Sequence, residues 1–442
     1  MSIESLQNVV QEQFELTQKN LNGSYDSFSN VIRRQEFERF LQLGIPTTKN
    51  EEWKYTNVFP FLRSDFSFPE QLELSNDFRI FIESTIQKVN PSFALVLVNG
   101  KISNGFSLNL DEYLGTIQDI DSYAKSNKED FEKQFNSLCT DKNSAFSSLS
   151  TAFSQNGFVI SFVKNVQISE PLYILNFIDS STVSTIVPTR FLISASKFSK
   201  ATIIEQSLTF GENQSIYIPT SEVFVDNQAN ISIVKIQNDK PNSMVVDSMY
   251  LHQNESSNAS VCTISYGSSL IRNNHESIHN GPNIHTNLFG LAFAKNKQLI
   301  DNHTVVDHAS AHCSSTELYK HILTDNSTVV FNGKVFVRDQ AQKTNAYQSN
   351  KTILLSDNAT INSKPQLEIF ADDVKCSHGA TCGGVDEDAL FYLRSRGISS
   401  KDALSLLTYA FAEEILENVP VQSLKESIEN DIRSFLSNKT DK

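Results

Sequence analysis

The spacing of hydrophobic residues changes twice along the chain and divides it into three parts. In residues 1–155, apolar side chains recur at helical spacing, as in Ile3–Lys19 and Ser27–Leu43. Residues 156–378 instead carry short β-branched and aromatic runs broken by Asn, Asp, Ser and Gly, a pattern typical of strands. Residues 379–442 return to helical spacing. We therefore predict a mainly helical N-terminal domain, a β core and a helical C-terminal domain.

A recurring pattern within the β region predicts that its strands stack as the coils of a solenoid. A turn-rich stretch is followed by a small residue and then a β-branched run, at starting positions separated by 28, 30, 68 and 32 residues. These positions are Ala201, Ala229, Ala259, Ser327 and Ala359. A period near 30 residues in an all-β region is typical of a solenoid. An irregular β-sandwich is the alternative, and we favour the solenoid because the period exceeds that of a hairpin repeat.

Capping residues predict three helices in the C-terminal region. Asp386, Ser399 and Ser423 each stand where a helix N-cap is expected, and Gly397 and Pro420 end the first two helices. The second helix has an apolar face formed by Ala403, Leu406, Leu407, Ala410, Phe411 and Ile415. Part of this face must pack on the rest of the protein. The helices could cap the solenoid, dock a partner, or both.

The charge balance restricts the partners that the chain can bind. It has 37 basic and 51 acidic residues and a net charge of −14, which repels nucleic acid and anionic membranes. The first residues lack a secretory signal, and no apolar run approaches the roughly 20 residues that a spanning helix needs. We expect a soluble, cytoplasmic protein that binds a protein partner with a basic surface. The five cysteines form no C-x-x-C pair, so reduced thiols are expected.

The densest group of metal-ligand residue types is the segment from His303 to Cys313, which also contains Asp307, His308 and His312. On a strand, however, residues 303 and 307 face one way while 308 and 312 face the other. We therefore favour a polar strand face. A mononuclear metalloenzyme built on this segment is kept as an alternative function.

A thiol and an imidazole two residues apart, Cys376 and His378, form the second candidate site. On a strand both leave the same face, and both are ligands for iron or an iron–sulfur cluster. Gly379, Gly383 and Gly384 let the backbone turn out of the sheet just afterwards, which predicts a boundary position. Two ligands do not complete a cluster site, so others would come from another chain. A Cys–His nucleophile pair and an inert boundary cysteine are the rival interpretations.

Two enzyme classes find little support in the sequence. Adjacent Asp372 and Asp373 would face opposite ways on a strand, which makes them a poor carboxylate pair for a β-helix carbohydrate enzyme. The chain has neither a G-x-x-x-x-G-K-[ST] nor a G-x-G-x-x-G pattern, so any ATP must be bound by another chain.

Several segments resemble the SufB/SufD family of iron–sulfur cluster assembly proteins. They are Glu51–Thr56, Ala341–Asn350, Pro365–Ile369, Phe370–Thr381 and Phe391–Ile398. The SufD branch fits better than the SufB branch, which usually has an acidic residue after the corresponding cysteine and a cysteine cluster near its N-terminus. Here Ser377 follows Cys376, and the first cysteine is Cys139. A SufB-like paralogue is the alternative.

The resemblance implies a right-handed parallel β-helix core between helical N- and C-terminal regions. It also implies a non-catalytic scaffold that builds and delivers nascent iron–sulfur clusters with two partners. SufB would bind through the β-helix, and the ABC-type ATPase SufC would bind through the C-terminal helices. A homodimer could form when the chain is alone. The family's assembled complex is also associated with reduced flavin, for which this sequence has no motif.

The resemblance further implies roles for particular residues. His378 matches a histidine implicated in building the nascent cluster at the SufB–SufD interface, and Cys376 lies beside it. Both are expected as transient metal ligands shared with SufB. The second C-terminal helix is expected to dock SufC through Leu406, Phe411 and Ile415. Cys382 departs from the family's pattern and is expected to be an incidental thiol.

Overall fold

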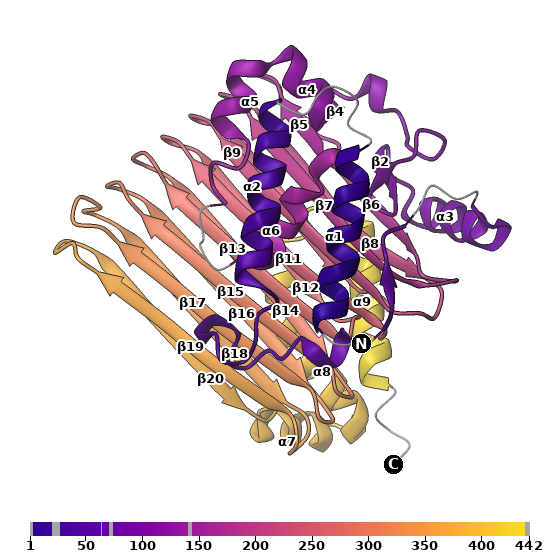
Figure 1. Ribbon diagram of the computed structural model, residues 1–442. Coiled ribbons are helices and arrows are strands. Elements are labelled where there is room, and N and C mark those ends of the chain that lie inside the picture. Colours follow the sequence, from indigo (N-terminus) through magenta and orange to yellow (C-terminus); the bar gives the residue numbers. More distant parts are fainter. Residues whose placement is uncertain (1–2, 20–26, 63, 70–73, 140–143, 438–442) are drawn as a thin grey trace.

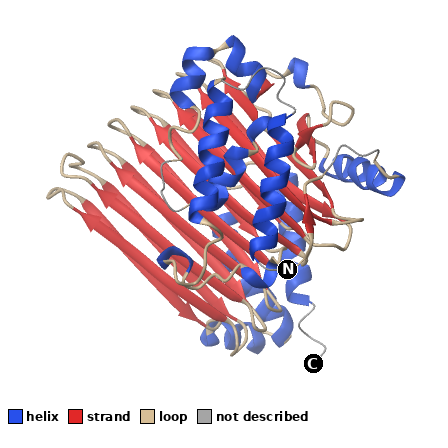
Figure 2. Cartoon of the chain, in the orientation of Figure 1, coloured by secondary structure: helices blue, strands red, loops and turns tan. Residues whose placement is uncertain are grey.

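The strands form a parallel β-helix, which confirms the predicted mainly β solenoid flanked by helical regions (Figures 1 and 2). The computed structural model describes residues 3–19, 27–62, 64–69, 74–139 and 144–437. Successive strands of the solenoid alternate between two ten-stranded sheets, called sheet A and sheet B below. Neighbouring strands within the coil stack are parallel, and the first strands of both sheets add antiparallel pairs.

Strand β19, the second-to-last strand of the stack, forms one edge of sheet A. Its spatial order is β19 (Thr360–Ile369), β17 (Thr328–Val337), β15 (Leu299–His308), β13 (Leu270–His279), β11 (Ser243–Gln253), β9 (Ser215–Val225), β7 (Ser184–Ala195), β5 (Phe158–Phe162) and β4 (Gly115–Asp119). Strand β1 (Phe66–Ser67) pairs with β7.

Sheet B carries the final strand of the stack at the corresponding edge. Its order is β20 (Lys375–Gly383), β18 (Asn345–Leu354), β16 (Ser314–Leu323), β14 (His285–Ala294), β12 (Asn258–Ser265), β10 (Asn230–Gln237), β8 (Lys200–Phe210), β6 (Leu172–Asp179), β2 (Phe93–Val98) and β3 (Lys101–Ile102).

The length of a coil agrees with the period seen in the sequence. In-register partners in sheet B are 27 to 31 residues apart, from Asn258–His285 at the short end to Ser314–Asn345 at the long end. The recurrence nevertheless mixes the two sheets, because Ala259 lies in sheet B whereas the run after Ser327 forms β17 of sheet A. The gap of 68 residues is thus a change of sheet, since strands of both sheets begin after similar turns.

Successive side chains along each strand point alternately into the space between the two sheets, called the lumen below, and toward the outer faces of the sheets. The apolar core of the lumen includes Ile203, Ile233 and Val261, which stack in register on β8, β10 and β12. Outward-facing side chains of the same sheets are covered by helices over much of the stack. The fold therefore has a filled interior and two helical outer layers.

The N-terminal helices cover the outer face of sheet A (Figure 1). They are α1 (Ile3–Lys19), α2 (Phe28–Leu43) and α6 (Ala145–Ala152), with η1 (Glu51–Trp53) beside them. Phe14 stacks on Phe37, with ring centroids 3.9 Å apart, and Trp53 packs on Phe146. The remaining elements of this region are η2 (Phe59–Phe61), α3 (Asn76–Val89), η3 (Leu110–Glu112), α4 (Ile120–Ser126), α5 (Lys128–Gln134) and η4 (Ser154–Asn156).

Two of the three described C-terminal helices pack on the outer face of sheet B. The helices are α7 (Glu387–Ser395), α8 (Ser400–Leu416) and α9 (Gln422–Ser437). Helices α8 and α9 lie on the sheet, and α7 packs on α8. The carboxylate of Asp386 accepts a hydrogen bond from the amide of Ala389, and the Ser399 hydroxyl accepts one from that of Asp402, which confirms two predicted caps. Ser423 was wrong as a cap: Lys425 N already donates to Val421 O, so the helix starts earlier.

The strands extend beyond both ends of the segment 156–378. Strands β2 and β4 come from the N-terminal region and join the two sheets, while β20 runs on to Gly383. The apolar run Phe93–Val98 is buried at its four central positions, which places it inside the fold rather than on a helical surface. None of the described helices is both long and apolar enough to cross a membrane.

Candidate functional site

The stack ends in two strands that are each paired on one side only. In the order of the sheets, β19 has β17 as its neighbour and β20 has β18, and nothing in the described residues follows either. Both strands lie at the bare end of the solenoid, away from α1, α2 and α6 (Figure 1). Their outer edges therefore present backbone N–H and C=O groups that a further strand could pair with.

Cys376 and His378 lie on the lumen face of β20. In the register of the sheet, Cys376 stands next to Ala346 and His378 next to Gln348. Both neighbours are buried, with exposed fractions of 0% and 3%. Because in-register residues of parallel strands project to the same side, the thiol and the imidazole share one face at the open end of the lumen.

The two side chains differ in their surroundings. Cys376 is half-buried against an apolar cluster that includes Val335, Val337 and Ala346, and burial raises the pKa of its thiol. His378 is exposed on the last strand. Of the two, the imidazole is therefore the group that an incoming ion or chain reaches first, and the thiol needs a partner charge before it ionises readily.

Of the three glycines after the pair, Gly384 lies in a bend directly after β20, but Gly379 and Gly383 do not turn the chain out of the sheet, contrary to the sequence-based prediction. Gly379 and Gly383 are members of β20 and pair with Ser349 and Ile353. The boundary position arises instead because β20 is the last strand of its sheet. Cys382 also lies on the lumen face, next to Thr352, but is exposed and four residues beyond His378.

Two buried polar residues behind His378 escaped the sequence analysis. Gln348 and Glu317 stand on successive strands in register with His378, and the amide of Gln348 donates to Glu317 across 3.2 Å. Each looks like an ordinary polar strand residue when read alone. Only the 30-residue recurrence, applied in exact register, would have aligned the three positions.

The segment from His303 to Cys313 does not form a metal site. His303 faces outward between Asp301 and Glu52, whereas His308 faces the lumen and its Nδ1 lies 3.1 Å from that of His279. The Cys313 thiol donates to the carbonyl of Gly281. Strand alternation thus separates the ligand types, and the described residues contain no group of three that could hold a metal ion. The mononuclear metalloenzyme interpretation was wrong.

Asp372 and Asp373 lie in the turn between β19 and β20 and are both exposed. Asp373 pairs with Lys343 of the preceding coil. They are turn residues rather than a carboxylate pair on a strand, and the arrangement offers no groove for a carbohydrate chain between them.

The predicted docking face on α8 is only partly available. Leu406 is 49% exposed, but Phe411 is half-buried over Lys320, and Ile415 is completely buried against sheet B. Ile415 was therefore wrong as a docking residue, because it belongs to the core that holds α8 in place. No docking residue was predicted on α7, the first of the C-terminal helices, where Phe391 and Tyr392 are 72% and 56% exposed.

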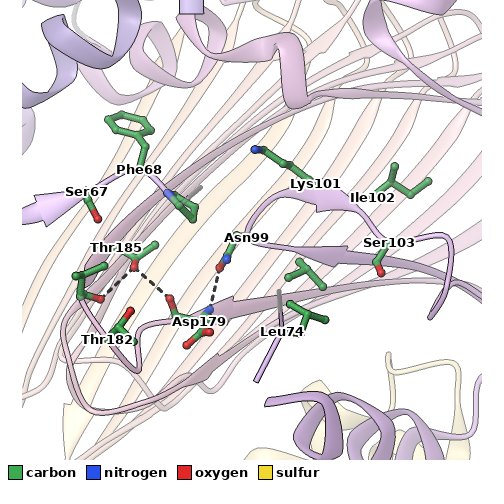
Figure 3. A pocket seen from close by; sticks show the side chains of 13 residues that line it. Ser67, Phe68, Leu74, Asn99, Lys101, Ile102, Ser103, Asp179, Thr182 and Thr185 are labelled. Carbon is green, nitrogen blue, oxygen red and sulfur yellow. Dashed lines mark hydrogen bonds between the residues drawn. The ribbon is translucent and has the colours of Figure 1, made fainter. Parts of the chain in front are cut away.

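One cavity lies at the other end of the solenoid. It has a volume of about 410 Å³ and is lined by β1, by the β2–β3 hairpin and by the turn after β6. Figure 3 shows Asn99 accepting a hydrogen bond from the backbone of Asp179, with Thr185 beside it. None of the five described cavities is lined by Cys376 or His378, which lie on the open last strand of sheet B.

Comparison with protein families gives two matches that together span most of the chain. Residues 177–411 match the SufBD core domain of the SUF system for FeS cluster assembly. Residues 4–174 match the SufBD protein N-terminal region.

Similar proteins occur in bacteria and plants. A SufBD family iron–sulfur cluster assembly protein of Synechocystis is 29% identical over 92% of this chain and 90% of its own length. The iron–sulfur cluster assembly protein SufD of Escherichia coli is 28% identical over 89% of this chain and 90% of its own length. The chloroplastic protein ABCI7 of Arabidopsis thaliana is 27% identical over 92% of this chain and 86% of its own length.

Proposed function

The chain belongs to the SufBD family of iron–sulfur cluster assembly proteins, and from this premise we propose that it is a SufD-type scaffold subunit that helps to build nascent clusters. It acts with SufB and the ATPase SufC in the cytoplasm, and it is not an enzyme on its own. The cluster is cargo that forms on the complex and leaves it.

One observation carries this proposal: an exposed imidazole and a half-buried thiol share the lumen face of the final strand, which is paired on one side only. Thiolate and imidazole are both ligands of iron–sulfur clusters. Two side chains leave such a cluster incomplete. A site at the open end of a solenoid can be completed by another chain, and His378 is the residue that we assign first.

The open edges of β19 and β20 suit a second β-helix as the partner. Strand addition would continue both sheets and satisfy the free backbone groups. Apolar side chains flank these edges: Ile369 and Phe370 are 41% and 56% exposed, and Tyr347 on β18 is 49% exposed. SufB is the proposed partner, and a second copy of this chain would use the same edges when SufB is absent.

The ATPase is proposed to dock on the C-terminal helices. Phe391 and Tyr392 on α7 and Leu406 on α8 are exposed, and α7 has no buried residue of its own. An amphipathic helix with exposed aromatic side chains is a common docking element. The buried residues of α8, Ile415 among them, then anchor the docking surface to sheet B.

A reduced flavin in the assembled complex remains a secondary proposal. A flavin ring needs a slot with polar groups for its edge. The described cavities are lined by neither Cys376 nor His378, so the fit is poor at the proposed site and no step is assigned to a flavin.

The test is His378→Ala in the full chain co-expressed with SufB- and SufC-type subunits. The matched control is Ser377→Ala, one residue away on the opposite, outer face of β20. We expect cluster content and the activation of an apo-protein acceptor to fall strongly for His378→Ala and to stay unchanged for Ser377→Ala. Unchanged cluster content in His378→Ala, with the complex intact, would refute the proposal.

A further inference from the structure

A column of side chains runs through the lumen toward the open end. In register from β14 to β20 it consists of Leu288, Glu317, Gln348 and His378. The first three are buried and the last is exposed. Neighbouring strands lie about 4.8 Å apart, so each side chain stands directly on the next.

Glu317 is a buried carboxyl group whose partners are neutral. Its Oε2 accepts a hydrogen bond of 2.5 Å from Thr304 on β15, and its Oε1 accepts one from Gln348. Among the described residues no basic side chain forms an ion pair with it, unlike Glu205 and Asp247, which flank Lys235. Burial raises the pKa of Glu317 to about 7, against the opposite effect of the two hydrogen bonds.

The hydrogen-bond partners and in-register neighbours of Glu317 are uncharged. Thr304 approaches from β15, Gln348 from β18 and Leu288 from β14. Tyr319 follows on its own strand, and burial, together with the charge of Glu317, raises the pKa of that phenol. Glycine occupies position 333 on β17, where a Cβ atom would lie 2.4 Å from Gln348 Nε2.

Only one of the two polar atoms of the Gln348 side chain has a hydrogen-bond partner among the described residues. Its Nε2 donates to Glu317, and its Oε1 is buried without a hydrogen-bond partner among the described residues. A buried amide oxygen left unpaired is costly, so such an atom calls for a donor. The next side chain in the column, toward the open end, is the imidazole of His378.

We propose that Gln348 and Glu317 are positioning residues for His378, an inference that rests on the function proposed above. Gln348 Oε1 accepts a ring N–H of His378, which fixes the tautomer and leaves the other ring nitrogen with its lone pair facing out of the lumen. Glu317 holds the amide of Gln348 in the required orientation. Outer partners of this kind orient imidazole ligands in metal sites.

The orientation depends on the charge of Glu317. The ionised carboxylate only accepts, so the Gln348 NH₂ group faces it and the amide oxygen faces His378. After taking up a proton from water, Glu317 gains an O–H group, and in the proposed switch this group donates to Gln348 Oε1 once the amide rotates. His378 then meets an NH₂ group instead of an oxygen. Positioning is therefore present above a pH of about 7 and is lost as the pH falls through that value.

The first experiment compares Gln348→Leu with Asn350→Leu in the co-expressed complex. Asn350 is the matched control, because it lies on the same face of the same strand, is equally buried and has an unpaired Oδ1, but stands next to Ala380. We expect Gln348→Leu to slow cluster formation about 10-fold or more relative to Asn350→Leu. Equal rates in the two variants would overturn the proposal.

The second experiment records the pH profile of cluster formation for the wild type and for Glu317→Gln. The wild type should lose activity as the pH falls through about 7, and Glu317→Gln, which cannot ionise, should lose this step while co-purifying normally with its partners. Asn350→Leu should keep the step. A step that persists in Glu317→Gln would overturn the role of Glu317.

His378→Ala separates the two proposals. If it leaves cluster formation unchanged, the proposed function fails and the positioning chain fails with it. If His378→Ala abolishes cluster formation while Gln348→Leu matches Asn350→Leu, only the positioning chain fails. A spectroscopic change in iron bound to the Gln348→Leu complex, absent in the control, supports positioning over a merely structural role.

Discussion

Charged pairs differ in their exposure between the coils that lie under the helices, called the covered coils below, and the end of the same solenoid. In the covered coils Arg190 and Glu222 form an ion pair in which both side chains are completely buried. Between the last two coils Lys343 and Asp373 form a pair in which both are more than half exposed. Helices shield the first region from water, whereas β19 and β20 have a neighbour on one side only. Stability therefore resides in the covered coils, and the last coil is free to meet a partner.

The sharpest way to break this comparison is to remove one member of the buried pair. Glu222→Gln leaves the Arg190 charge without its partner and also replaces an acceptor of the amides of Asn136 and Leu138. We expect the free energy of unfolding to fall by about 3–5 kcal/mol. Urea denaturation measures it.

The control for that change is Asp373→Asn in the last coil. Its ion pair is exposed and screened, so the loss should stay within about 0.5 kcal/mol. Equal losses in the two variants would show that the covered and open coils do not differ in the way described.

The buried histidines of the lumen should lower the stability of the covered coils at acidic pH. Burial lowers the pKa of His308 to about 4, with the charge of Asp307 opposing the shift. The unfolded chain binds a proton near pH 6.5 that the folded chain refuses, so stability is complete above that pH and is lost as the pH falls toward 4.

For His308→Gln we expect this loss between pH 6.5 and 4 to shrink by roughly 2–3 kcal/mol. Unfolding free energies measured from pH 4 to 8 test it. The same variant at pH 8, where neither form carries the charge, reports the purely structural cost of the substitution. A pH dependence identical to that of the wild type would contradict the assignment.

Glycines mark the same contrast in packing. At Gly290 a Cβ atom would lie 2.2 Å from the Tyr319 ring, whereas at Gly379 nothing lies within 4 Å. We expect Gly290→Ala to cost about 1–3 kcal/mol by overpacking and Gly379→Ala to be nearly neutral. Thermal denaturation of the two variants tests this. A loss at Gly379 equal to that at Gly290 would mean that the last coil is as tightly packed as the covered ones.

The contrast also explains what could be predicted from the sequence. Period, alternation and caps are local, and they led to the solenoid, to the shared face of Cys376 and His378 and to the caps at Asp386 and Ser399. Features that depend on which elements pack together in the fold were not predicted. Ile415 reads as one more apolar residue of a helix face, and only the docking of α8 on sheet B buries it.

The column of side chains behind His378 was not predicted from the sequence for the same reason. Glu317, Gln348 and His378 are about thirty residues apart, and a one-residue error in register would send one of them to the outer face. The recurrence located the coils without fixing that register, because its starting positions came from both sheets. The return to helical spacing indicated where the stack ends, but only the order of the sheets showed that β19 and β20 each have an open edge.

Substitution of an exposed residue on α7 should have the smallest effect on the stability of the chain and the largest effect on its assembly with the ATPase. Phe391 on α7 is 72% exposed, so Phe391→Ser should change the free energy of unfolding by no more than about 0.5 kcal/mol. Co-purification with the ATPase should be lost, because exposed aromatic side chains dominate such interfaces. Leu16→Ser on α1, 53% exposed, is the matched control and should leave co-purification intact. If both variants bound the ATPase equally, the exposed face of α7 would be ordinary surface, and docking would have to use residues that now hold α8 and α9 to sheet B.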